Sequence, residues 1–156
     1  MYAESLITQL LMAFFISIIF VSFTFVAFIN NAQAIEANWQ PWSESILDKA
    51  VKENRLVFIS LTADWCMFCK KMDKTTYVDK SVIDELKLNY IAIKADEAKY
   101  PELAKKYANV GRPGTIILDA KGKTLMAKTG YLKPQQMLWM LQGTFADNKP
   151  AGKANE

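Results

Sequence analysis

The chain contains no histidine and only two cysteines among its 156 residues. The lack of histidine excludes an imidazole as a general base, as a metal ligand or as the partner of a cysteine nucleophile. A structural zinc site takes four ligands, usually from cysteine and histidine, so two cysteines fall short of one. Any thiol chemistry in this chain therefore depends on Cys66 and Cys69.

A large excess of charge of one sign is also missing. The chain carries 19 lysine and arginine residues against 16 acidic residues, for a formal net charge of +3. The two signs are interspersed, as in residues 70–74, which read KKMDK. This pattern is typical of a solvated surface rather than of a basic stripe that binds nucleic acid. We therefore expect no nucleic-acid partner.

One long hydrophobic run is present, and it is confined to residues 10–29, which contain no charged residue. At about 1.5 Å per residue, a helix of this length spans the roughly 30 Å of a bilayer core. Behind it, Ala32 and Ala34 have the spacing of a signal-peptidase site. Residues 1–34 are thus predicted to be a cleaved signal peptide, with an uncleaved membrane anchor as the alternative. Either form predicts export, to the periplasm if the chain is bacterial, where disulfides persist.

The remainder is predicted to comprise a linker at residues 35–42, one domain at residues 43–146 and a polar tail at residues 147–156. Hydrophobic periodicity predicts the order helix, strand, helix, helix, strand, helix, strand, strand, helix. Parallel strand–helix–strand units followed by a hairpin indicate an α/β fold, with a mixed central sheet and helices on both faces. The apolar run at residues 56–61 is typical of a buried central strand.

The most informative motif is the C-x-x-C pair, Cys66 and Cys69, which follows that strand directly. The pattern becomes helical at the first cysteine, and the N–H groups and dipole of a helix N-terminus stabilise a thiolate. A thiolate is the species that attacks disulfides, so the motif predicts a dithiol–disulfide redox centre. Cys66 is expected to be the exposed attacking thiol and Cys69 the buried resolving thiol. Trp65 would shield the pair and offer an apolar surface to the partner.

Two other hypotheses stay open at this point. Copper(I) can be held by two thiolates, with Met67 or Met72 nearby, which would make the chain a copper chaperone. The chain is alternatively a binding module with a static, redox-inactive disulfide, although so short a loop restrains the unfolded chain little. The redox reading is preferred, with no metal and no cofactor beyond the Cys66–Cys69 disulfide.

Residues 63–70 (ADWCMFCK) and 110–113 (VGRP), together with the strand that follows, resemble the thioredoxin superfamily over about residues 40–145. Within it, the chain is similar to the thioredoxin-like C-terminal domain of DsbD and to small exported proteins of that kind. The resemblance implies a thioredoxin fold, a cis peptide bond before Pro113 and a main chain at Arg112 that binds the substrate. It also implies a thiol–disulfide oxidoreductase, acting as a reductase on protein disulfides and supplied by a membrane electron-donor protein.

The sequence departs from that family at Ser60, six residues before the first cysteine. The family usually places there a buried acid that relays the proton of the resolving thiol, which a serine cannot replace as a base. Proton transfer is therefore expected to use water, Asp64 or Lys70. Arg112 would place a cation beside the disulfide, where it favours the Cys66 thiolate and selects acidic substrate segments.

Overall fold

The computed structural model describes residues 36–149. The predicted signal or anchor at residues 1–34 lies outside the described residues, as does most of the predicted polar tail. In the described part, no helix has both the length and the apolar character needed to cross a membrane. The elements follow in the order β1 (Trp39–Gln40), α2 (Ser45–Glu53), β2 (Leu56–Thr62), α3 (Met67–Thr75), α4 (Lys80–Asn89), β3 (Tyr90–Asp96), α5 (Pro101–Lys106), β4 (Gly114–Leu118), β5 (Thr124–Thr129) and α6 (Pro134–Asp147).

The five strands form one mixed sheet in the order β1-β3-β2-β4-β5. Strands β1 and β2 run parallel to β3, whereas β4 runs antiparallel to β2 and β5 antiparallel to β4. The apolar strand β2 lies in the middle, and its residues from Leu56 to Leu61 are all buried. The mixed α/β sheet predicted from the sequence is confirmed.

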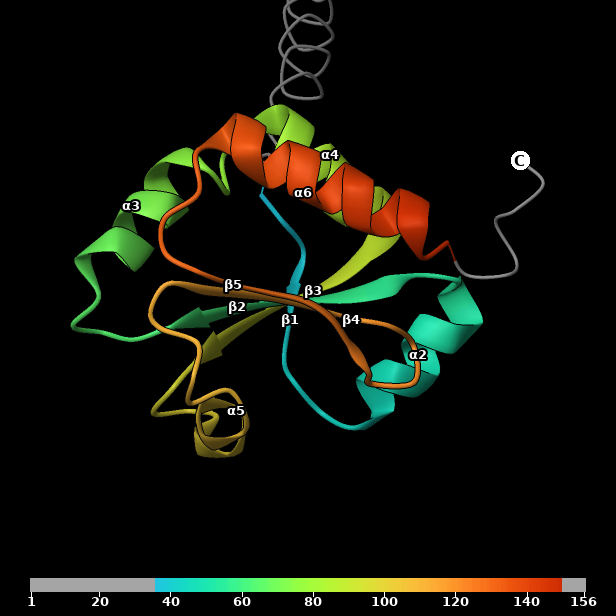
Figure 1. Ribbon diagram of the computed structural model, residues 1–156, viewed down its shortest axis with the longest axis horizontal. Coiled ribbons are helices and arrows are strands. Elements are labelled where there is room, and N and C mark those ends of the chain that lie inside the picture. The colour runs from blue at the N-terminus through green and yellow to red at the C-terminus, as the bar shows by residue number, and fades with distance from the viewer. Residues whose placement is uncertain (1–35, 150–156) are drawn as a thin grey trace, which may run out of the picture. The chain divides into compact units, whose positions relative to one another are not determined.

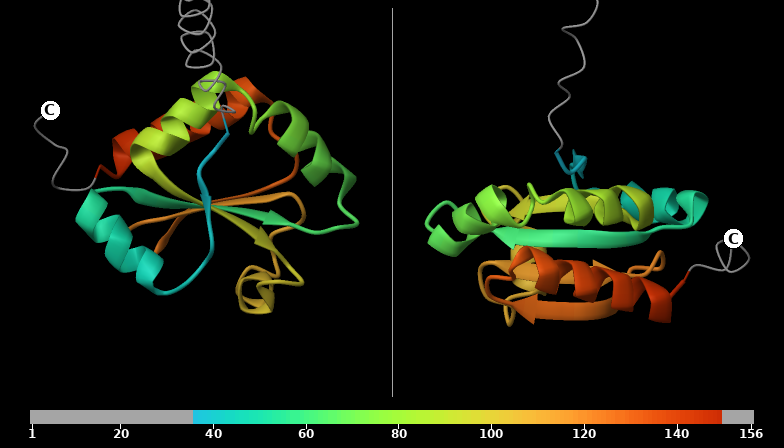
Figure 2. Two further views of the ribbon diagram at one scale, coloured as in Figure 1. Left: turned by 180° about the vertical axis from the view of Figure 1, so that it is seen from behind. Right: turned by 90° about the horizontal axis from the view of Figure 1, so that it is seen from above.

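Helices cover both faces of the sheet, as Figure 1 shows with the sheet seen nearly on edge. Helices α3, α4 and α6 pack on one face, and α4 and α6 lie side by side there in both views (Figures 1 and 2). Helices α2 and α5 cover the other face. Because side chains alternate along a strand, β2 sends Phe58 into the first core and Val57 and Ile59 into the second. The two cores together fix β2, and with it the position of the cysteines that follow.

Strand β1 was not expected, because its residues fall in the predicted linker at residues 35–42. Trp39 and Gln40 pair in parallel with Ala92 and Ile93 of β3. The Trp39 ring also packs edge-on against the ring of Tyr77, with their centroids 4.9 Å apart. A strand of two residues is too short to produce a periodic pattern, so only its partners in the fold define it.

Candidate functional site

The Cys66–Cys69 pair lies where β2 passes into α3. Cys66 is in extended backbone conformation directly before α3, and its Sγ accepts a hydrogen bond from the backbone N–H of Cys69 at 3.1 Å. The two cysteines form a disulfide, with their Cα atoms 5.3 Å apart. The same N–H group would stabilise a Cys66 thiolate after reduction, because it already points at that sulfur. The predicted position of Cys66 at a helix N-terminus is thus observed.

The prediction that Cys66 is exposed is wrong for this disulfide form. Cys66 is 3% exposed and Cys69 is 4% exposed, so burial does not distinguish them. Both pack with Ala63 in a small apolar cluster at the end of β2. The neighbouring side chains of Trp65, Met67 and Phe68 instead point to solvent. The sulfurs are therefore enclosed, whereas the side chains next to them in the sequence are exposed.

Glu97, which follows β3, contacts both Trp65, next to the cysteines, and Arg112, next to the cis-proline. Its Oε1 accepts a hydrogen bond from Trp65 Nε1 at 2.7 Å, and its Oε2 lies 3.3 Å from Arg112 Nε. The second contact is an ion pair rather than a hydrogen bond, because Arg112 Nε has no hydrogen-bond partner in the described chain. The Arg112 Nη1 donates to the carbonyl of Val110 at 2.6 Å. The Arg112 side chain is only 8% exposed, so it is not the free cation expected from the sequence.

The Arg112–Pro113 peptide bond is cis, and Pro113 is buried at the start of β4. Register places this loop at the same end of the sheet as the cysteines, because Gly114 pairs with Leu61 near the end of β2. Gly114 is required here, since a Cβ atom would lie 2.8 Å from the carbonyl oxygen of Gly111 and 3.2 Å from Leu61 Cβ. The structure thus brings the Arg112–Pro113 loop and the C-x-x-C loop to one edge.

Ser60 lies in a group of neutral hydroxyls. The Tyr77 hydroxyl donates a hydrogen bond to Ser60 Oγ at 3.0 Å, and both residues are buried. Thr115 pairs with Ser60 across the strands, and its buried Oγ1 has no hydrogen-bond partner among the described residues. Burial raises the pKa of Tyr77 well above its ordinary value, and the nearby Asp73 carboxylate raises it further. This group therefore stays uncharged at neutral pH.

A charged hollow of about 350 Å³ adjoins the disulfide. Asp64 and Lys70, the two groups expected to assist proton transfer, both line it, and so does Ala63, which packs on both cysteines. Across the hollow, Lys94 Nζ forms an ion pair with Asp73 Oδ1 at 2.6 Å. The hollow is polar and roomy enough to admit water beside Ala63.

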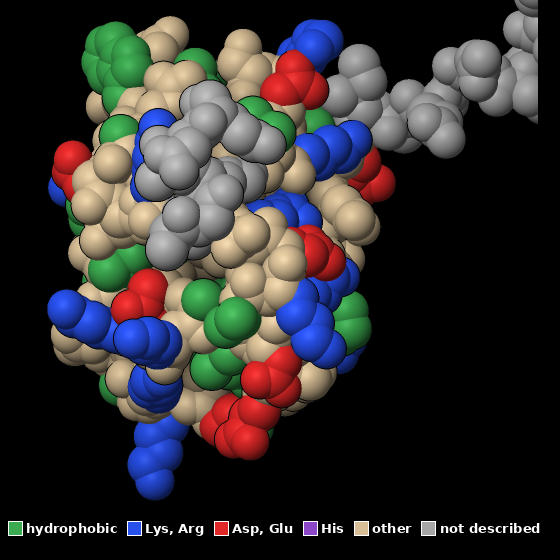
Figure 3. Space-filling view, turned by 90° about the vertical axis from the view of Figure 1, so that its right-hand side faces the viewer, with side chains coloured by type: hydrophobic (Ala, Val, Ile, Leu, Met, Phe, Trp, Pro, Cys, Tyr) green, Lys and Arg blue, Asp and Glu red, His purple; other side chains and the backbone are tan. Residues whose placement is uncertain are grey.

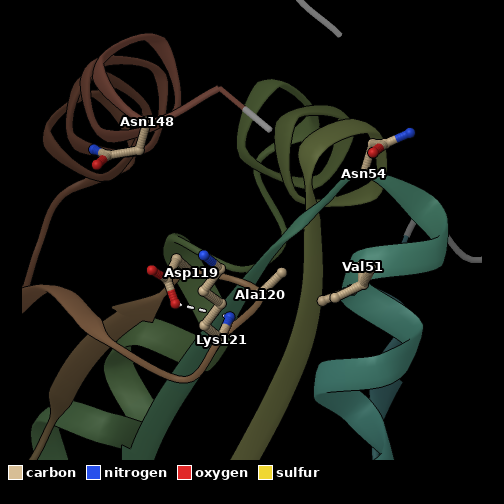
Figure 4. A pocket seen from close by; sticks show the side chains of 7 residues that line it. Val51, Asn54, Asp119, Ala120, Lys121 and Asn148 are labelled. Atoms are coloured by element: carbon tan, nitrogen blue, oxygen red, sulfur yellow. Dashed lines mark hydrogen bonds between the residues drawn. The ribbon is translucent and has the colours of Figure 1, made fainter. Parts of the chain in front are cut away.

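A second hollow, of about 370 Å³, lies at the other end of the sheet (Figure 4). Its lining includes Val51 from α2, Asp119 from the turn after β4 and Asn148, which follows α6. The start of β2 pairs with the end of β4, so this hollow is distant from the cysteines, which follow the end of β2. Across residues 36–149 there is no group of three or more histidine, cysteine, aspartate or glutamate residues that could hold a metal ion.

Comparison with known proteins places the chain in a family. The family model Thioredox_DsbH, described as "Protein of unknown function, DUF255", matches residues 24–147. The chain belongs to this family. Members of the DsbD group are relatives: the thiol:disulfide interchange protein DsbD of Yersinia pestis is 32% identical over 115 residues, which make up 70% of this chain and 19% of that protein. The chain therefore spans less than a fifth of the curated relatives that it matches.

Solved structures agree with this assignment. The oxidised C-terminal domain of Neisseria meningitidis DsbD aligns with 65% of this chain and 91% of its own length, with 25% identity and a TM-score of 0.54. A thioredoxin from Thermus thermophilus has the same fold, with a TM-score of 0.65 and 19% identity over 78% of this chain and 96% of its own. The chain therefore has a thioredoxin-like fold and carries a C-x-x-C disulfide between β2 and α3.

Proposed function

We propose that this protein is an exported thiol–disulfide oxidoreductase that reduces disulfides in other proteins. The observation that carries the proposal is the hydrogen bond from the Cys69 N–H to Cys66 Sγ, made at the start of a helix by one half of a C-x-x-C disulfide. This bond favours the thiolate form of Cys66 over that of Cys69. Its relatives named as thiol:disulfide interchange proteins support the same chemistry.

The reaction proceeds by two exchanges. The Cys66 thiolate attacks one sulfur of the substrate disulfide, forming a Cys66–substrate disulfide and releasing the other substrate sulfur as a thiolate. The Cys69 thiol loses its proton to water in the charged hollow, and the thiolate attacks Cys66 Sγ. This step forms the Cys66–Cys69 disulfide and releases the second substrate sulfur. The substrate gains two electrons and two protons, and a donor dithiol must then reduce the Cys66–Cys69 disulfide again.

The remaining site residues take supporting roles. Trp65 provides apolar contact beside the sulfurs, and the main chain at Arg112 and Pro113 pairs with the substrate chain. Asp64 receives the proton of Cys69 through water. We propose that the enzyme is exported, to the periplasm if the chain is bacterial, either free or anchored at the outer face of a membrane. The hydrophobic run at residues 10–29 and the adjacent signal-peptidase pattern support this proposal. Its electron donor would be a membrane protein, because two cysteines cannot carry electrons across a bilayer.

Reduction of insulin disulfides in the presence of dithiothreitol tests the chemistry. The intact protein should accelerate the reaction, Cys66→Ser should abolish the acceleration, and Cys69→Ser should allow attack without turnover. Equal acceleration by the intact protein and Cys66→Ser would contradict the proposal. Tight copper(I) binding by the reduced protein, without turnover of any disulfide, would instead support the copper-chaperone hypothesis.

The direction of electron flow needs a measurement in cells. Alkylation of cell extracts quenched with acid should find Cys66 and Cys69 mainly reduced in the steady state, as a reductase requires. Removal of the membrane donor should shift the pair to the disulfide. A pair that stays oxidised whether or not the donor is present would show that the protein acts as an oxidase.

A further inference from the structure

The buried disulfide is surrounded by exposed apolar side chains. Trp65 is 68% exposed, Met67 80% and Phe68 59%, although side chains of this size are normally withdrawn from water. The Phe68 ring lies 6.5 Å from the ring of Tyr131, which extends the apolar surface toward α6. We call Trp65, Met67, Phe68 and Tyr131 the apolar collar. Contiguous exposed apolar groups of this kind mark sites of contact with another molecule.

Lysines continue this surface along α3. Lys70, Lys71 and Lys74 follow Met67 at spacings of three, four and seven residues, which places all four on one exposed face of the helix. Lys71 Nζ lies over the ring of Tyr131, 4.8 Å from its centroid, so the charges reach the apolar collar itself. We call Lys70, Lys71 and Lys74 the lysine stripe.

The nearby acids do not neutralise the lysine stripe. Asp73, on the same helix, is paired with Lys94, and Glu97 is held by Trp65 and Arg112. Asp64 shares the charged hollow with Lys70, but no carboxylate in residues 36–149 lies within ion-pair distance of the stripe. By contrast, the face that contains α2 shows basic and acidic side chains side by side (Figure 3). The lysine stripe therefore keeps an unpaired positive charge on α3, the helix that begins directly after Cys66.

We propose that the lysine stripe and the apolar collar together select protein partners whose disulfide is flanked by acidic and apolar residues. The proposal rests on the proposed function, because it names the class of substrate used by the same site. The sequence suggests Arg112 as the cation that selects acidic substrates, but its side chain is buried against Glu97. The proposal assigns that role to the three exposed lysines instead. Such exposed charges act over about 10 Å at 0.1 M salt, and they raise the rate of encounter more than they slow dissociation.

Two synthetic peptides provide the probe. Each carries one intramolecular disulfide flanked by leucines, and the flanking charges are glutamates in one peptide and lysines in the other. At low ionic strength, the full protein should reduce the acidic peptide with a kcat/KM roughly ten-fold above that of the basic peptide. The preference should decrease steeply in high salt, because the contacts are exposed to solvent. Equal kcat/KM values for the two peptides would overturn the inference and leave the proposed function intact.

A pair of double variants locates the effect. The double variant Lys71→Gln with Lys74→Gln removes two charges of the stripe and leaves Lys70, which lines the charged hollow. The control, Lys52→Gln with Lys121→Gln, removes two charges from α2 and from the turn after β4. The first variant should lose most of the preference for the acidic peptide, and the control should keep it. An unchanged preference in the first variant would refute the role of the stripe, and reduction of neither peptide by the intact protein would refute the proposed function itself.

Discussion

Replacement of Glu97 tests whether Trp65 and Arg112 are held together by one carboxylate. Glu97→Gln keeps an oxygen that can accept the Trp65 N–H but removes the charge facing Arg112. Glu97→Ala removes both contacts and leaves the guanidinium of Arg112, which is 8% exposed, without a counter-ion. The two variants therefore separate the hydrogen bond from the ion pair.

The magnitudes follow from exposure. Trp65 is 68% exposed and water competes for the contact, so its hydrogen bond to Glu97 is worth about 1 kcal/mol, below the usual range for a charged acceptor. The side chain of Glu97 is 33% exposed, and a partly exposed ion pair contributes about 1 kcal/mol. We expect Glu97→Gln to lower the free energy of unfolding by about 1 kcal/mol and Glu97→Ala by about 2 kcal/mol. For a domain of this size, these losses lower Tm by roughly 4 °C and 8 °C.

The kinetic assay asks whether the carboxylate positions Trp65 or only stabilises the fold. In Glu97→Ala the Trp65 side chain loses the hydrogen bond that fixes its indole, so KM for a peptide disulfide should rise several-fold while kcat changes little. Glu97→Gln should keep the KM of the intact protein, because its amide oxygen still holds the indole. The exposed acid Glu36 supplies a control, Glu36→Ala, that should change neither quantity. Intact stability and an intact KM in Glu97→Ala would refute the reasoning.

Three further predictions concern the cysteines and the hydroxyl group beneath them. In Cys69→Ala, attack by Cys66 continues but resolution stops, so dithiothreitol-sensitive adducts with partner proteins should accumulate on non-reducing gels; their absence would contradict a substrate-directed role. Ser60→Asp places a carboxylate beside the Tyr77 hydroxyl and should speed resolution in stopped-flow traces at neutral pH, at a cost in stability from desolvation. Resolution rates equal to those of the intact protein at every pH would show that this position does not affect proton transfer. Because the pKa of Tyr77 is raised in the fold, its hydroxyl loses its proton above about pH 10 in the unfolded chain but keeps it in the folded chain. The free energy of unfolding should therefore fall as the pH rises above about 10. Tyr77→Phe should reduce that fall by up to about 1.4 kcal/mol per pH unit, and identical slopes in alkaline denaturation would count against the buried hydroxyl.

Local patterns in the sequence are sufficient to predict the centre of the site. The apolar run of β2 and the change to helical periodicity at Cys66 depend only on residues close together in the sequence, so the sequence predicts both. The role of Glu97 could not be predicted from the sequence, because its contacts require β3 to pair with β2 in one particular register. The same register decides the role of Arg112, which the sequence presents as a free cation and the fold pairs with Glu97.

The burial of Cys66 was also beyond the sequence, for a different reason. A position before a helix is usually open to solvent, and the sequence predicts an exposed thiol on that basis. In the fold, Cys66 turns toward Ala63 and Cys69, and the larger apolar residues take the outer positions. Side-chain direction at a helix start depends on the turn that precedes it, and residues 63–66 give no periodic signal there.

Strand β1 sets a limit on how far the protein can be shortened. A chain cut to begin at Ser43, the start suggested by periodicity, would leave one edge of β3 unpaired from Ala92 to Ile93. It would also expose the aromatic faces of Tyr77 and Phe58, which Trp39 covers. Such an edge can pair with a second molecule, so the shortened protein should self-associate. We therefore expect a stable shortened protein to need a start before Trp39, at or ahead of the buried Ala37.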